Sequence, residues 1–527
     1  MTSSRALARA GLIVSGAFLV SRVLGWIRVV VIVNAFGGAG SIDRLDEFYA
    51  AFRLPDLVFQ LVAAGALSSA VIPILAALLA TGETARTWRV ASTIANLMLL
   101  GLLVTGVIVF VAAPVIIPAV IAPGWDATPE RWTRTVDLTR IMILSPIFLA
   151  LGSLATSVLN AQGRFVASAI APIIYNLAII GAALLLAPAY GVTALAIGVV
   201  AGSIGHLLVQ VWPLRALGYR YDRDVDVADP EARKALTLMA PRALGLGAGQ
   251  ITFVVVTSLA SGLQNGAVTA FNTAFTLLQI PIGVIGVPLG VVVLPSLSRE
   301  VAAGRIHEFA ALMSRAIRLI VFVMLPITAV AIVVRHDVVQ LLFSRLDPSA
   351  VDLTAATLLT FLVGLTAHAL IAVLARAFYA RQDTRTPVAA AILAVIVNSS
   401  LAAILVGPMG LPGLGLAIAI AAWLETIVLV ALLRRTLPEL EIGPIVDLAI
   451  RSAGVAVAGG LVAAGVSSAL GLVMGADPSR IGILVRLTIV GTVWLLTSAA
   501  VAAVLRIGEL AAIIALMLDL VRRPRGA

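Results

Sequence analysis

Charged side chains interrupt two apolar stretches near the start of the chain, among them Arg22, Arg28, Asp46 and Arg53. A charge at the centre of a bilayer costs at least ~2.5–3.5 kcal/mol, so such side chains usually face a wet cavity or an opposite charge. Guanidinium groups bind phosphates through two parallel hydrogen bonds. The three arginines therefore predict a site for an anion such as a diphosphate, with Asp46 on the same helix stripe as Arg53. The alternative is that Arg22 and Arg28 pair with Asp46 and Asp56 and lock the helices together.

Residues that could bend a helix lie beside these charges. Gly25 lies between the two arginines of the first helix, and Pro55 follows Arg53 in the second. Irregular backbone at membrane depth is tolerated where it lines a cavity. We therefore expect Gly25 and Pro55 at the wall or gate of a cavity, together with the polar residues Thr276 and Gln279.

A second kind of candidate site would bind a proton or a cation. Glu425 is a carboxylate in the middle of a later apolar stretch, and Asn398 is an amide in another. Both are candidates for ion coupling, whereas pairing of Glu425 with a neighbouring helix and interhelical hydrogen bonding of Asn398 are the alternatives. The four histidines have no metal-ligand spacing, so we expect neither a metal site nor a cofactor.

The elements that position these residues must be membrane helices. The 527 residues are 61% hydrophobic and only 12% charged, with a mean hydropathy of +1.11. So few charges cannot cover soluble domains of this size, which excludes soluble enzymes. Cysteine is absent, which excludes disulfides and thiolate catalysis. The net charge of +10 is spread over many short connections, so we expect no nucleic-acid partner.

Apolar segments of about 20 residues predict an all-α polytopic membrane protein with fourteen transmembrane helices. The expected spans lie near residues 8–36, 45–80, 90–122, 136–159, 166–187, 192–217, 235–262, 266–297, 308–334, 352–379, 387–407, 413–433, 445–472 and 482–505. Residues 507–521 are interpreted as a short amphipathic interfacial helix. Basic residues concentrate on alternate connections, which places both the N- and the C-terminus in the cytoplasm.

An internal repeat divides the chain. Phe48–Leu54 matches Phe271–Leu277, and two further pairs of segments match in the same order. The repeat predicts two six-helix lobes related by a pseudo-two-fold axis along the membrane normal, followed by two C-terminal helices. In the second copy of the repeat, Thr276 occupies the position that Arg53 has in the first copy. We therefore expect the cationic site to be formed mainly by the first lobe. The expected boundaries are 1–217 for the first lobe, 218–234 for a cytoplasmic linker, 235–436 for the second lobe and 437–527 for the last two helices and the tail.

Several motifs in combination resemble the signature of the MurJ (MviN) family of lipid II flippases, over about residues 15 to 435. The motifs are Ser21–Arg28, Asp46–Pro55, Gly65–Leu67, Val71–Pro73, Leu294–Ser298, Phe378–Asp383 and Thr386–Pro387. In this resemblance Arg22, Arg28 and Asp46 fall on charged positions of the signature, and Arg53 falls where the family often has a basic residue.

The resemblance implies a transporter rather than an enzyme, in the bacterial cytoplasmic membrane. Family members move lipid II, an undecaprenyl-diphosphate-linked glycopeptide, from the inner to the outer leaflet by alternating access, for peptidoglycan synthesis and cell shape. The implied partners are lipid II, membrane lipids and the cell-wall synthesis machinery. Coupling to the membrane potential, H⁺ or Na⁺ would supply the energy.

Two alternatives stay open within the same superfamily of multidrug, oligosaccharidyl-lipid and polysaccharide exporters. One is a flippase for another undecaprenyl-diphosphate-linked oligosaccharide. The other is a multidrug or cation antiporter, which would favour acidic rather than arginine residues in its cavity. A membrane glycosyltransferase would need a larger loop than the longest polar connections, near residues 126–137 and 218–233.

Overall fold

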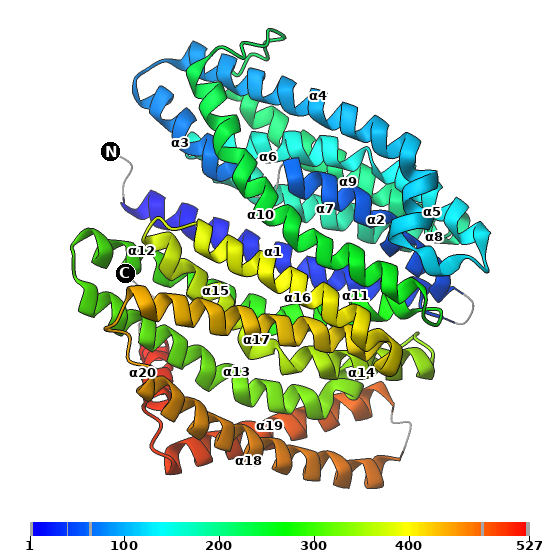
Figure 1. Ribbon diagram of the computed structural model, residues 1–527, viewed down its shortest axis with the longest axis vertical. Coiled ribbons are helices and arrows are strands. Elements are labelled where there is room, and N and C mark those ends of the chain that lie inside the picture. Colours follow the sequence, from blue (N-terminus) through cyan, green and yellow to red (C-terminus); the bar gives the residue numbers. More distant parts are fainter. Residues whose placement is uncertain (1–3, 39–40, 63–65, 476–478, 523–527) are drawn as a thin grey trace. The chain divides into compact units, whose positions relative to one another are not determined.

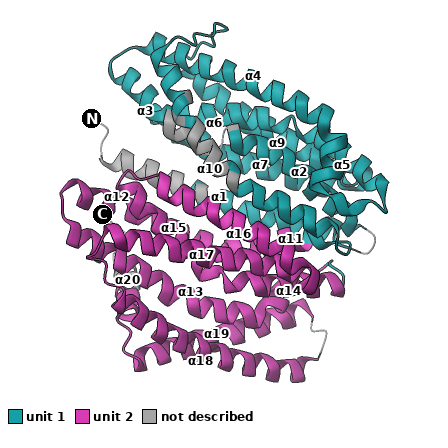
Figure 2. Cartoon of the chain, viewed as in Figure 1, with its two compact units in different colours: residues 1–269, 345–347 teal, residues 270–344, 348–527 magenta. Residues whose placement is uncertain are grey.

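Helices make up nearly all of the computed structural model, which describes residues 4–38, 41–62, 66–475 and 479–522 (Figure 1). The chain forms two compact units (Figure 2): residues 1–269 with 345–347, and residues 270–344 with 348–527. We call them unit 1 and unit 2.

Unit 1 contains long helices joined by short turns. Its helices are α1 (Ser4–Phe36), α2 (Ile42–Val62), α3 (Ala66–Ala80), α4 (Thr84–Ile116), the π-helix η1 (Ile117–Ile121), the 3₁₀-helix η2 (Pro123–Trp125), α5 (Pro129–Met142), α6 (Ser145–Ala161), α7 (Phe165–Leu185), α8 (Ala187–Tyr190), α9 (Thr193–Ala216) and α10 (Pro230–Ser261). The first turn of α11 (Ala267–Pro281) also belongs to it.

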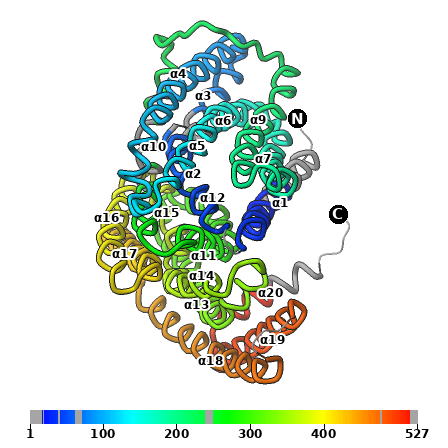
Figure 3. The backbone as a smooth tube through the Cα atoms, turned by 90° about the vertical axis from the view of Figure 1, so that its right-hand side faces the viewer, coloured from blue at the N-terminus to red at the C-terminus, as the bar shows by residue number. Residues whose placement is uncertain are grey.

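Unit 2 contains the rest of α11 and the helices that follow. They are the π-helix η3 (Ile282–Gly286), α12 (Val287–Ala302), α13 (Ile306–Leu342), α14 (Pro348–Val363), α15 (Leu365–Ala380), α16 (Arg385–Met409), α17 (Leu411–Thr436), α18 (Gly443–Met474), α19 (Arg480–Val504) and α20 (Gly508–Arg522). In unit 2, α18 and α19 lie side by side (Figure 3), and together with α20 they share a small apolar cluster with α13.

The described residues contain 11 helices that are long and apolar enough to cross a membrane. The pair α14 and α15, bent by 46°, would make a twelfth span. The protein is thus an all-helical polytopic membrane protein. The predicted span 45–80 includes residues outside the described part. Two shorter apolar helical segments are Val71–Ala80 of α3 and Gly249–Ser261 of α10.

Close helix packing depends on glycine at several positions, of which Gly202 and Gly364 are examples. A Cβ at Gly202 of α9 would lie 2.8 Å from the backbone oxygen of Tyr175 on α7, and one at Gly364 would lie 2.8 Å from the Cα of Ala419 on α17. Gly364 also separates α14 from α15. Lipid offers no hydrophobic force to drive membrane helices together, so their association depends on close packing, which small residues allow.

Helix α10 packs on α2 and α3 and therefore belongs to unit 1, whereas the repeat predicts a second lobe that begins at residue 235. The predicted lobe boundaries stay a prediction. Tail residues 508–522 form α20, which is joined to α13 by an ion pair of 2.7 Å between Glu509 and Arg318.

The N-terminus of α10 is capped by Asp229, whose carboxylate accepts hydrogen bonds from the N–H groups of Glu231 and Ala232 at 2.8 and 3.2 Å. Arg86 pairs with the same carboxylate at 3.2 Å. Partial burial acts to raise the pKa of Asp229, but the two backbone donors and Arg86 outweigh it and hold the pKa below its ordinary value of 3.8.

Candidate anion-binding site

Arg22 lines a pocket of unit 1 between α1, α6 and α7. The pocket has a volume of about 420 Å³ and is lined by Ser21, Arg22, Thr156, Asn160, Phe165, Ser168, Ala169 and Pro172. The Ser168 hydroxyl donates to the side-chain oxygen of Asn160 at 2.9 Å, and the Thr156 hydroxyl donates to Gln210 at 2.8 Å. The arginine therefore shares its pocket with several groups that can donate or accept hydrogen bonds.

Arg28 lies further along α1, at a junction with α2 and α7. Its guanidinium carbon is 5.8 Å from the ring centroid of Tyr175 on α7, within the range of a cation–π contact. Tyr49 and Asp56 of α2 are also within electrostatic range of this guanidinium. Arg28 is only partly buried, so water or an anion can reach it.

Arg53 of α2 is more enclosed, with 8% of its surface exposed. Its Nε donates to the hydroxyl of Thr257 at 2.8 Å, and its guanidinium carbon is 5.2 Å from the ring centroid of Phe253. Both partners belong to α10. Two of the three predicted arginines, Arg53 and Arg28, are within electrostatic range of one carboxylate, that of Asp56.

Asp46 is buried, with 2% of its surface exposed, and its carboxylate has a full set of partners. The backbone N–H groups of Gly266 and Thr269 donate to it at 2.7 and 2.8 Å, and the Thr269 hydroxyl donates at 2.7 Å. Arg131 of α5 approaches to 3.4 Å. Asp46 therefore caps the first turn of α11, and its ion pair is with α5 rather than with the arginines of α1.

Two further arginines complete a buried network that sequence reasoning missed. Arg134 donates to both oxygens of the fully buried Glu47, at 2.9 and 2.7 Å, and Arg131 lies 3.7 Å from the same carboxylate. Arg131 also donates to Asn265 at 2.8 Å and lies over the ring of Trp125. The sequence placed both arginines in an exposed connection; their spacing of three on one helix face was the signal that could have found them.

Gly25 lies inside α1 and Pro55 inside α2, and both helices are continuous through these positions. A Cβ at Gly25 would meet nothing within 4 Å, so α1 has open space between its two arginines. Pro55 is buried. The gate role of these residues stays a prediction.

The other candidate residues lie in unit 2. Asn398 of α16 is 2% exposed, and neither its amide nitrogen nor its amide oxygen has a hydrogen-bond partner among the described residues. Glu425 lies half-buried on the neighbouring helix α17, and Gln279 is half-buried on α11. The Thr276 hydroxyl donates to the backbone oxygen of Asn272 at 2.8 Å. Within the described residues, no cluster of three or more His, Asp or Glu could hold a metal ion.

Most of this chain is similar to known proteins of one family. The family model of the lipid II flippase MurJ matches residues 32–476. A lipid II flippase MurJ of Burkholderia cenocepacia is 33% identical over 447 residues, 81% of this chain and 84% of the relative. A probable lipid II flippase MurJ of Rhizobium tropici is 32% identical over 434 residues, 80% of each chain.

Solved structures share the fold. A lipid II flippase MurJ in an inward closed conformation has a TM-score of 0.77 at 21% identity, covering 94% of this chain and 99% of the other. An inward-facing multidrug resistance transporter of the MATE family has a TM-score of 0.61 at 17% identity, covering 80% and 95%. On the extent of the family match and the identity to its members, the chain belongs to the MurJ family of lipid II flippases.

Proposed function

We propose that this protein moves lipid II from the inner to the outer leaflet of the cytoplasmic membrane, for peptidoglycan synthesis. It acts as a transporter and not as an enzyme. Family membership supports the proposal. The observation that carries it is the set of arginines in unit 1, with Arg22 in a polar pocket and Arg28 and Arg53 around one carboxylate. Arginine suits a diphosphate because its fork of donors matches phosphate oxygens.

The three arginines have different parts in the proposed site. Arg22 and Arg28 are partly exposed, so they can exchange water for the diphosphate of lipid II. Arg53 already donates to Thr257 and lies near Asp56. By balancing the charge of Asp56, Arg53 leaves the charge of Arg28 available to the substrate. Arg53 therefore contributes to the electrostatics of the site more than to direct contact.

Asp46 enters the proposal as a positioning residue. Its carboxylate is occupied by Gly266, Thr269 and Arg131, so it has little capacity left for a ligand. A carboxylate at the first turn of a helix also satisfies backbone donors that would otherwise be unpaired. Asp46 thus fixes the start of α11 relative to α2.

Transport by alternating access requires the substrate and an energy source to favour different states. The membrane potential alone supplies ≈ 2.3 kcal/mol per elementary charge per 100 mV. We propose Glu425 and Asn398 as the sites that could couple transport to H⁺ or Na⁺, because one is a carboxylate and the other a buried amide without a partner. Gly25, Pro55, Thr276 and Gln279 stay candidates for the cavity wall or gate.

The proposed topology has fourteen spans in two six-helix lobes and a C-terminal pair, with both termini in the cytoplasm. Support comes from the alternation of basic connections and from helices in each predicted range. Because the chain has no cysteine, single cysteines can report the topology directly. A cysteine at Gly82 should be labelled from the cytoplasm and one at Ala127 from the outside; the reverse result would overturn the orientation.

The decisive experiment measures lipid II on the outer leaflet of cells depleted of this protein. Accessibility of lipid II to an external probe should fall on depletion and recover with the wild-type chain. The Arg28→Ala variant should not restore it, whereas the matched control Arg220→Ala, on an exposed turn outside the site, should. Unchanged accessibility after depletion would refute the proposal.

A multidrug antiporter is the second candidate, because transporters of the MATE family share the fold. A cavity for an organic cation would favour acidic side chains, whereas the residues that line the polar pocket beside α1 include an arginine and no acidic residue. A flippase for another undecaprenyl-diphosphate-linked oligosaccharide would use the same diphosphate site. Transport assays with purified protein in vesicles, using lipid II, a different lipid-linked sugar and an organic cation in parallel, would separate the three.

A further inference from the structure

The linker between α9 and α10 is fastened across α4 by specific contacts. The Tyr219 hydroxyl is 3.0 Å from the hydroxyl of Ser92, and its ring meets the ring of Trp88 edge-on at 5.5 Å. The Tyr221 hydroxyl donates to the side chain of Asn96. The phenol oxygens of both tyrosines are thus engaged by α4, which fixes where their rings lie.

These two tyrosines cover a pocket in unit 1 that is separate from the candidate anion site. It has a volume of about 420 Å³ and is lined by Ala91, Ala95, Leu151, Leu154, Ala155, Val158, Leu207, Val211, Leu214, Arg215, Tyr219 and Tyr221. All but three of these side chains are aliphatic. The size lies within the range of ligand pockets. A long apolar ligand with a polar end would suit it.

The polar end of such a ligand would meet Arg215, which lies exposed at the end of α9. Arg215 has no ion pair among the described residues. Three of the four linker carboxylates accept hydrogen bonds from backbone N–H groups: that of Asp222 from Asp224, that of Asp226 from Ala228, and that of Asp229 from the start of α10. Arg215 therefore offers its charge to an anion outside the protein.

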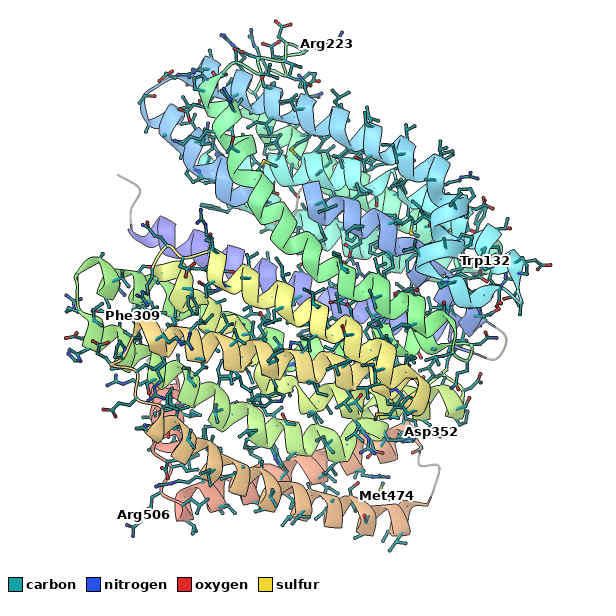
Figure 4. All side chains as sticks on the ribbon, viewed as in Figure 1. Trp132, Arg223, Phe309, Asp352, Met474 and Arg506 are labelled. Atoms are coloured by element: carbon teal, nitrogen blue, oxygen red, sulfur yellow. The ribbon has the colours of Figure 1, made fainter. Side chains whose placement is uncertain are left out.

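Neighbouring side chains place this end of the pocket at a membrane surface. Trp212, one turn before Arg215, is 79% exposed, and Tyr221 is 55% exposed. Tryptophan and tyrosine gather at the level of lipid headgroups. Arg223 lies on the same linker, at the outer edge of unit 1 near the first turns of α4 (Figure 4). In the proposed topology this is the cytoplasmic side, where the leaflet is rich in anionic lipids.

We propose that this pocket binds an anionic phospholipid of the inner leaflet, with an acyl chain between α4, α6 and α9 and its phosphate on Arg215. The inference goes beyond the proposed transport of lipid II and does not depend on it. A lipid held there would contact both the linker and α9. It would thereby stabilise the linker in its position on α4.

The test uses the full-length protein, purified in detergent and stripped of lipid, titrated with phosphatidylglycerol or phosphatidylcholine of identical chains. Native mass spectrometry counts the bound lipids. Phosphatidylglycerol should bind about fivefold more tightly, the effect of one basic residue at a lipid surface. Arg215→Ala should abolish that preference, and the control Arg220→Ala, on the same linker but outside the pocket, should keep it.

A second pair of variants tests the apolar part. Ala155→Phe, which fills the pocket, should weaken binding of both lipids, whereas Leu208→Phe on the exposed side of α9 should leave it unchanged. Equal binding of the two lipids by the wild type, or equal effects of Arg215→Ala and Arg220→Ala, would overturn the proposal. Displacement of the phospholipid by an undecaprenyl-diphosphate lipid at an equal concentration would also overturn it, by assigning the pocket to the transported lipid.

Discussion

Replacing Asp46 with alanine tests whether this carboxylate positions α11 or binds substrate. The change leaves the N–H groups of Gly266 and Thr269 without their acceptor, and each unsatisfied buried donor costs about 1–3 kcal/mol. The change also removes one partner of the buried Arg131, which keeps its hydrogen bond to Asn265 and its longer contact with the carboxylate of Glu47. We therefore expect the start of α11 to lose about 3–5 kcal/mol, the range for breaking a buried ion pair.

Hydrogen exchange of the protein in lipid nanodiscs measures this loss where it occurs. A local loss of about 3 kcal/mol corresponds to roughly hundredfold faster exchange of the amides of Gly266 and Thr269. The control is Asp43→Asn, since Asp43 contributes its backbone oxygen, which this change retains, to Arg131.

The same variant separates the two roles of Asp46. If Asp46→Ala weakens binding of lipid II while exchange near α11 stays as in the wild type, Asp46 is a ligand and the positioning argument is wrong. If hydrogen exchange near α11 rises as expected, any loss of lipid II binding follows from the displacement of that helix. Binding is measured on the same nanodiscs.

Three further predictions follow from other contacts. Arg28→Ala should abolish rescue of a depleted strain at unchanged protein level, and Arg28→Lys should rescue it partly, because a point charge loses the bidentate geometry; full rescue by Arg28→Ala would remove it from the site. Arg486→Ala leaves the buried Asp337 unpaired and should lower the free energy of unfolding in detergent by about 3 kcal/mol. The control Arg451→Ala, which breaks an exposed ion pair, should lower it by no more than ~1 kcal/mol. Equal losses in the two variants would contradict the prediction. Folding lowers the pKa of Asp229, so the ionised carboxylate stabilises the start of α10 above pH 3.8, and this stabilisation is lost as the pH falls below that value. Cleavage of the linker by pepsin should therefore increase below pH 3.8 in the wild type and not in Asp229→Asn.

The amino-acid sequence alone determined the class of the protein and the helices that carry its charges. Apolar length and composition predict membrane helices because each span must satisfy its own backbone in lipid. The charges of the first two helices were recognisable for the same reason: an arginine in an apolar run needs a partner or water. Arg22 and Arg28 were selected as candidate residues this way, whereas the short apolar run at residues 507–521 predicted the helix that the structure shows as α20.

Only the tertiary structure decided which partner each charge has. Asp46 and Arg53 lie on one helix, yet the first contacts α5 and the start of α11 and the second contacts α10. Arg131 and Arg134 look exposed in the sequence because charged residues are frequent in connections, and their burial depends on Glu47 far away in the chain. The periodicity of the sequence predicts which face of a helix a residue occupies. Which other helix packs against that face depends on the tertiary structure.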